Sequence, residues 1–181
     1  TAIRAGKFLQ KINIPIKPRK QIKQYKSFPI SQLPFSLNDL QHEPGRVLCY
    51  WGDPGWGELA KTGKKNNSFD AELVSASAKL ITTEWNPTPF PSWLTFVPSD
   101  RSDLVEKFAN ELANELEIEC IEVVKKIKHN SPQKEMQNRF YRCTNLDGVF
   151  EISSNIPSGP MLLIDDIFDS GWTFTVISSL L

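Results

Sequence analysis

The sequence predicts an α/β domain in which helices cover both faces of a parallel sheet. Short apolar segments alternate with amphipathic ones from residue 92 onward, and a further amphipathic segment precedes them. Strands that alternate with helices pair in parallel, because each helix carries the chain back to the same end of the sheet. A parallel sheet built in this way is buried on both faces.

The expected elements can be placed in order along the chain. A strand at 46–51 enters a turn rich in Gly and Pro, and helical spacing of apolar residues marks 70–82. The glycines at 57 and 63 do not form a P-loop, because one residue too many separates them and Lys65 stands where Ser or Thr is required. The regular alternation that follows gives strands at 92–97, 119–127, 149–152 and 161–164, and helices at 102–117 and 173–181.

Charge is distributed unevenly along the chain. The 181 residues carry 21 basic and 21 acidic side chains, yet residues 1–26 contain many basic residues and no Asp or Glu. This segment can contact the phosphates of DNA, because Lys and Arg bound there release counterions. It can equally be a solvated linker or a docking arm, since the closely spaced prolines at 15–34 favour extended chain.

Membrane, disulfide-rich and zinc proteins are not expected. No apolar run approaches the roughly 20 residues that cross a bilayer, and no secretory signal opens the chain, so we expect a cytoplasmic location. The three cysteines, Cys49, Cys120 and Cys143, are scattered and odd in number, which fits reduced thiols. Two histidines are too few for most zinc sites.

Two adjacent acids, Asp165 and Asp166, end the apolar strand expected at 161–164. In folds of this class, ligands bind beyond the carboxyl ends of the strands. Ionised carboxylates only accept hydrogen bonds, so an adjacent pair suits the vicinal hydroxyls of a ribose. A purely structural role would be costly, because the two charges repel each other and lose solvation. We therefore expect both acids to bind a ligand.

The loop that follows the acids, residues 169–173, predicts an anion site. It turns into the start of a helix, where free backbone N–H groups and the positive end of the helix dipole suit a phosphate. A glycine in the loop permits a positive φ, and Thr175 adds a hydroxyl. Two acids beside such a loop match the hydroxyls and the phosphate of ribose 5-phosphate, so the sequence predicts a site for this sugar phosphate. The residues expected to hold the phosphate are Ser170, Gly171, Trp172 and Thr173.

The stretch "LLIDDIFDSGWT", residues 162–173, resembles the phosphoribosyl-pyrophosphate signature of type I phosphoribosyltransferases. The resemblance implies their Rossmann-like fold, phosphoribosyl pyrophosphate as the ligand, and Mg²⁺ that bridges ligand oxygens near Asp165 and Asp166. "FVPSDR", residues 96–101, stands where the family has its pyrophosphate-binding loop, although a second glycine-rich element usual there is missing. The ligand-binding candidates that follow from this position are Pro98, Ser99 and Arg101.

Residues 131–152, "SPQKEMQNRFYRCTNLDGVFEI", resemble the hood of the ComF-like branch of this family. The shared features are a Pro-Gln pair, spaced arginines, an Asn and a Gly-x-Phe strand. The cations that this resemblance assigns to screening pyrophosphate charge are Lys125, Lys126, Lys134, Arg139 and Arg142. Each of them can equally be a solvated surface cation.

A wider resemblance covers most of the chain. Segments such as "RVLCYWGDPGWGELA", "FDAELVSASAKLI" and "PQKEMQN" are similar to the C-terminal region of bacterial RecQ-type DNA helicases that end in a phosphoribosyltransferase-like domain. On this resemblance, residues 1–40 are the end of a helical region and a basic linker. Residues 41–181 are the phosphoribosyltransferase-like domain, truncated at its C-terminus. No helicase motor motif lies in the chain, so the implied partners are the rest of the helicase, DNA through 1–26, and a second copy in a homodimer.

The sequence leaves two functions open. The favoured one is a module of a helicase that binds a phosphosugar or nucleotide. The alternative is an active phosphoribosyltransferase that transfers ribose 5-phosphate to a base or amine, with the catalytic candidate Asp169 as general base, as in related 6-oxopurine enzymes. Asp169 can instead cap the following helix. Trp172 can cover a bound base or simply pack.

Overall fold

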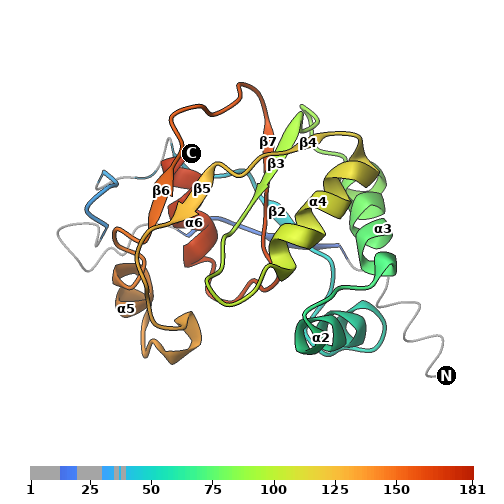
Figure 1. Cartoon of the computed structure of the whole chain (residues 1–181), viewed down its shortest axis with the longest axis horizontal. Coiled ribbons are helices and arrows are strands. Elements are labelled where there is room, and N and C mark those ends of the chain that lie inside the picture. The colour runs from blue at the N-terminus through green and yellow to red at the C-terminus, as the bar shows by residue number, and fades with distance from the viewer. Residues whose placement is uncertain (1–12, 20–29, 35–36, 38–39) are drawn as a thin grey trace.

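The computed structural model describes residues 13–19, 30–34, 37 and 40–181, and the helix end expected at 1–12 lies outside these ranges. The structure is mixed α/β, and its main sheet is parallel (Figure 1). The sheet has the order β4-β3-β7, formed by Glu119–Cys120, Trp93–Phe96 and Met161–Ile164. Strand β3 is central, with Trp93 opposite Met161 and Phe96 opposite Ile164. The predicted parallel sheet is therefore confirmed.

Helices lie on both faces of this sheet, as predicted. Helices α3 (Ala71–Lys79) and α4 (Leu104–Leu116) share a core with Leu94 of β3, whereas α6 (Trp172–Leu180) shares a second core with Trp93. Successive residues of a strand point to opposite faces, so Trp93 and Leu94 belong to different cores. Figure 1 shows α3 and α4 on one side of β3 and β7, and α6 on the other.

The predicted helices before and after β3 agree with the structure to within a few residues. The side chain of Asp70 caps α3, accepting a hydrogen bond from the Glu72 amide at 2.8 Å. Helix α3 continues into a wider helical turn, η1 (Leu80–Trp85). The helical spacing predicted that the apolar residues of this segment face inward. Leu73 and Ile81 are among those that are buried.

A second, smaller lobe carries the segment 121–152. Strands β5 (Val124–Lys126) and β6 (Phe150–Ile152) pair antiparallel, and η2 (Gln133–Glu135) and α5 (Arg139–Thr144) lie between them in the chain. The strand predicted at 119–127 is therefore divided between two sheets. Helix α5 was not predicted, although Asn138 caps it by accepting a hydrogen bond from the Tyr141 amide at 3.0 Å.

Near the N-terminus, the strand predicted at 46–51 is shorter and has an unexpected partner. Strand β2 (Gly45–Val47) pairs antiparallel with β1 (Ile14–Ile16), which lies in the segment predicted to be a linker. Helix α2 (Trp56–Asn66) was not predicted, because two glycines interrupt its pattern. Packing explains Gly57, since a Cβ there would lie 2.2 Å from the carbonyl oxygen of Tyr50.

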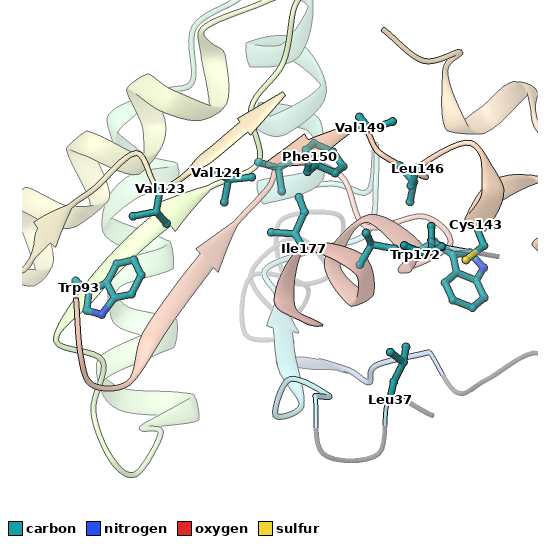
Figure 2. Close-up of a cluster of buried hydrophobic side chains, with 13 residues drawn as sticks. Leu37, Trp93, Val123, Val124, Cys143, Leu146, Val149, Phe150, Trp172 and Ile177 are labelled. Carbon is teal, nitrogen blue, oxygen red and sulfur yellow. The ribbon is translucent and has the colours of Figure 1, made fainter. Parts of the chain in front are cut away.

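One apolar core joins the sheet, α6 and the second lobe (Figure 2). Figure 2 shows Trp93 of the sheet, Ile177 of α6 and Phe150 of the lobe around the same interior. Ile30 and Leu37 also belong to this core, and each is 1% exposed. These two residues of the proline-rich segment lie inside the domain, not on its surface. The predicted boundary near residue 40 stays a prediction.

The cysteines are free thiols, and no described helix is long and apolar enough to cross a bilayer. Burial raises the pKa of the Cys49 thiol to about 11 and that of the Cys143 thiol to about 12. Thiols with such a high pKa are poor nucleophiles at neutral pH, because the thiolate is the reactive form.

Candidate functional site

The two adjacent acids lie where the sequence predicts them, at the carboxyl end of β7. The strand ends at Ile164, and Asp165 and Asp166 follow directly. The amide of Val97 donates to the carbonyl oxygen of Ile164 at 2.9 Å, so pairing with β3 continues to the end of the strand. Loop 98–101 therefore leaves the sheet at the same edge as the acids, where parallel folds bind ligands.

The carboxyl group of Asp165 is strongly perturbed by its surroundings. Desolvation raises its pKa to about 8, and the neighbouring Asp166 carboxylate adds to the rise. The Asp166 amide, which donates to Asp165 Oδ1 at 2.8 Å, acts in the opposite direction. The fold thus keeps this carboxyl in surroundings that disfavour its charge. Such perturbed groups concentrate at functional sites.

Asp166 has a cationic partner that the sequence did not indicate. Its side chain is 10% exposed and forms an ion pair with Lys64 of α2. Lys64 also lowers the pKa of Asp165, against the larger effect of desolvation. The two residues lie 102 positions apart, and α2 itself was not predicted, so no local pattern could have joined them.

The loop after the acids forms the start of α6. Gly171 has φ 76° and occupies the N-cap position, and no side-chain hydrogen bond caps the helix there. The first N–H groups of an α-helix have no partner within the helix. Ser170 Oγ accepts from the Trp172 amide at the long distance of 3.5 Å, and Ser170 and Thr173 are both partly exposed. The loop therefore turns into a helix start as the sequence predicts, and anion binding there stays a prediction.

Two side chains of this region are buried in the protein interior. The Trp172 side chain is 2% exposed and lies in the core with Cys143 and Leu37 (Figure 2), so it packs and does not cover a base. Thr175 is fully buried. Its Oγ1 donates to the carbonyl oxygen of Gly171 at 2.9 Å, which overturns the expectation that its hydroxyl faces a ligand.

Asp169 does not cap α6, so that alternative is wrong. Its Oδ2 accepts a hydrogen bond from Arg142 Nη1 at 2.7 Å, and its side chain remains 57% exposed. The carboxylate is therefore accessible to solvent and oriented by an arginine from α5. Arg142, one of the cations expected to screen pyrophosphate, lies beside the loop that starts α6.

The loop after β3 carries its own ion-pair cluster. Asp100, which the sequence did not single out, pairs with Lys126 Nζ at 2.7 Å and with His129 Nδ1 at 2.9 Å. The hydrogen bond from Lys126 lowers the pKa of Asp100. This cluster joins the loop of the main sheet to the second lobe. Lys126, one of the predicted cations, thus contacts the loop after β3, and its role toward a ligand stays a prediction.

The remaining predicted residues divide into three groups. Pro98 is partly buried in the loop, whereas Ser99 and Arg101 are exposed, with Ser99 Oγ accepting from the Arg101 amide at 3.2 Å. Lys125 is exposed, and no contact between it and the acids is found among the described residues. The side chains of Lys134 and Arg139 lie outside the described part of the structure.

A metal ion held by protein groups alone finds no support in the described residues. They contain no group of three or more His, Cys, Asp or Glu side chains that could hold one. One carboxylate of the acid pair is already neutralised by Lys64. The acids fit only an ion such as Mg²⁺ that is bound mainly by oxygens of its ligand and by water.

A cavity of about 760 Å³ opens beside the acids. It runs along β7, and its walls come from α3, α4 and the β1–β2 pair. Asp165, Asp166, Phe168 and Phe174 are among the residues that line this largely apolar space. The acids therefore border both the carboxyl edge of the sheet and this cavity.

Comparisons with known proteins do not assign this chain to a family. No protein-family model matches it, and neither curated proteins nor solved structures gave a match.

Proposed function

We propose that this chain is a domain of the type I phosphoribosyltransferase fold that binds a phosphosugar or nucleotide. The sequence resemblance to RecQ-type helicases supports the further proposal that it is an accessory part of such a helicase. The observation that carries the proposal is that two half-sites, the acid pair and the start of α6, lie at one edge of the sheet. Asp165 and Asp166 end β7, and the helix start at Gly171 follows within a few residues.

The two half-sites match the two ends of one ligand. Carboxylates at the strand end accept hydrogen bonds from the vicinal hydroxyls of a ribose. Backbone N–H groups at the start of α6 donate to a 5-phosphate, which the helix dipole also favours. A sugar phosphate has both features a few ångströms apart, so it fits the arrangement better than a simple anion or a neutral sugar.

Binding without turnover is the favoured form of the proposal. Three acids near the site are already paired with cations: Lys64 with Asp166, Arg142 with Asp169, and Lys126 with Asp100. These cations are less available to a pyrophosphate leaving group. Mg²⁺, carried by the oxygens of phosphoribosyl pyrophosphate, would supply the missing positive charge.

Active phosphoribosyl transfer is the second candidate. Asp169 favours it, because its side chain is exposed and does not cap α6. A nitrogen nucleophile would form a bond to the anomeric carbon as the bond to pyrophosphate breaks. Asp165 and Asp166 would stabilise the positive charge that develops on the sugar. The proton of the nucleophile would pass to Asp169, once the carboxylate leaves Arg142.

Calorimetric titration with phosphoribosyl pyrophosphate and Mg²⁺ tests the binding proposal. The double variant Asp165→Asn/Asp166→Asn should lose binding. Glu111→Gln/Glu115→Gln is the matched control, because it removes two exposed acids of α4 with the same change in charge. Absence of binding by the folded wild-type chain would reject the proposal.

Turnover separates the two candidates. Wild-type protein is supplied with phosphoribosyl pyrophosphate, Mg²⁺ and a panel of bases and amines, and release of pyrophosphate is followed. Release that disappears in Asp169→Asn establishes the enzyme. Binding without release for every acceptor supports the binding module.

A further inference from the structure

The proline-rich N-terminal segment contacts the loop that starts α6. Residues 13–19 begin with Asn13, whose Nδ2 donates to the carbonyl oxygen of Glu84 at 3.2 Å. Strand β1 then pairs with β2. The described part of the segment ends at Arg19, which is partly buried against the loop. This part of the segment is docked on the domain, whereas the sequence left a solvated linker open.

Arg19 is fixed at two points. Its backbone N–H donates to Thr175 Oγ1 at 2.9 Å, and its Nε donates to the carbonyl oxygen of Ser170. A Cβ placed on Gly171 would lie 3.4 Å from the same Nε. Thr175 Oγ1 in turn donates to the carbonyl oxygen of Gly171. Arg19 and Thr175 together therefore hold two successive carbonyl groups of the loop.

Holding a carbonyl oxygen also orients the next amide. A trans peptide is planar, and its C=O and N–H point in opposite directions. The carbonyl of Ser170 shares a peptide with the N–H of Gly171, and the carbonyl of Gly171 shares one with the N–H of Trp172. The contacts of Arg19 and Thr175 thus direct these two N–H groups to the opposite side of the loop.

We propose that Arg19 is a positioning residue of the phosphosugar site, through which the segment before the domain sets the affinity for phosphate. This inference rests on the proposed function, because the Gly171 N–H, which Arg19 orients through the Ser170 carbonyl, is among the groups expected to bind the 5-phosphate. Coupling of this kind is reciprocal, so bound phosphate also holds the segment in place. Displacement of residues 13–19 lowers affinity without any change in the acids.

Three single variants test the proposal by calorimetric titration with ribose 5-phosphate and with phosphoribosyl pyrophosphate plus Mg²⁺. Arg19→Gln removes the charged donor that holds the Ser170 carbonyl and should weaken both ligands about tenfold, which lies within the usual range of coupling between two sites. Arg19→Lys keeps a charged donor and should restore most of the affinity. Lys17→Gln is the matched control, since Lys17 is exposed on the same segment.

Amide hydrogen exchange supplies a measurement that would not change if Arg19 had a merely structural role. Phosphate ligands should protect the Arg19 amide in the wild type and in Lys17→Gln. The same protection should be reduced in Arg19→Gln at equal ligand occupancy. Melting temperatures of the free proteins show whether each variant is folded.

Each outcome decides the proposal. Wild-type affinity in a folded Arg19→Gln overturns it, while the loss of binding in Asp165→Asn/Asp166→Asn still supports the phosphosugar site. If Arg19→Gln does not fold, Arg19→Lys decides, because affinity within threefold of wild type supports the proposal and a tenfold loss overturns it. If the wild type binds neither ligand, both this inference and the proposed function fail.

Discussion

The end of β7 and the loop that follows it handle charge in opposite ways. At the strand end, Asp166 is 10% exposed beside the desolvated Asp165, and Lys64 is paired with it. In the loop, Asp169 is 57% exposed and pairs with Arg142. The guanidinium group of Arg19 contacts the carbonyl oxygen of Ser170 in the same loop. The strand end therefore holds two acids away from water in surroundings that disfavour their charge, whereas the loop presents backbone donors near positive charge.

In our proposal, this difference marks the place where the fold loses stability in order to bind its ligand. Two acids held close together with little solvent are unfavourable in the free protein, and a ligand that donates hydrogen bonds to them relieves the cost. The loop carries no comparable cost, because its acid is hydrated. Sites that are poorly stabilised in the absence of ligand are a common price of function.

The largest expected effect is on ligand affinity. Asp165→Asn should weaken phosphoribosyl pyrophosphate binding at least about 100-fold, because a neutral amide is a poorer acceptor for ribose hydroxyls and exposes donors in its place. Asp169→Asn should change affinity by less than about fivefold, since its carboxylate does not face the sugar in our proposal. Calorimetric titration of both variants makes the comparison. Equal losses would place the sugar nearer the loop than we propose.

The second prediction concerns pH. The pKa of Asp165 is raised to about 8 in the fold, from an ordinary value near 4 in the unfolded chain. The folded state therefore binds this proton more tightly, and its contribution to stability is full below about pH 4 and lost as the pH rises to about 8. Asp165→Asn should remove this loss and gain roughly 3 to 4 kcal/mol relative to wild type between pH 5 and pH 8.

Urea unfolding at pH 5 and pH 8 measures this difference. The variant keeps Oδ1 as the acceptor for the Asp166 amide, so the backbone geometry at the strand end is preserved. Asp169→Asn is the comparison variant in the loop. It should not reduce the loss of stability between pH 5 and pH 8. A wild type whose stability relative to Asp165→Asn is the same at both pH values contradicts the prediction.

The third prediction compares the two ion pairs. Lys64→Gln leaves Asp166 nearly buried without its cation and should lower the free energy of unfolding by about 1.5 kcal/mol, a value reduced by the exposure of Lys64. Arg142→Gln breaks an exposed pair and should cost about 0.5 kcal/mol or less. Urea unfolding at low and high salt measures both. An equal cost for the two variants would show that the acids at the strand end are better solvated than the structure indicates.

The sequence alone predicts the parallel sheet and the position of two acids at a strand end, because their signals are local. The apolar run that ends in Asp165 and Asp166, with a glycine loop and a helix after it, lies within a single stretch of chain. The alternation of strands and helices then predicts that this stretch lies at the edge of the sheet where parallel folds bind ligands. The predicted strands β3 and β7 and helices α3, α4 and α6 follow from periodicity of the same kind.

The rest could not be predicted, because it depends on contacts distant in sequence. Lys64 meets Asp166 only after α2 folds, and the glycines that let α2 pack closely also hide its helical pattern. Arg19 reaches the loop across 151 positions. Asp169 looks like a helix cap locally, but Arg142 of α5 provides a charged partner that the local sequence does not show.

The smallest expected effect isolates the geometry of the loop. Gly171 and Gly148 both have positive φ, 76° and 65°, and Ala at either position meets the same backbone strain. A Cβ on Gly171 would also lie 2.8 Å from the Phe168 ring, whereas nothing lies within 4 Å of one on Gly148. Gly171→Ala should therefore cost about 1 kcal/mol more than Gly148→Ala in urea unfolding. Because the added methyl also presses the loop toward Arg19, Gly171→Ala should weaken ribose 5-phosphate binding and Gly148→Ala should not. Equal binding by the two variants would show that the loop tolerates a change in the orientation of its N–H groups.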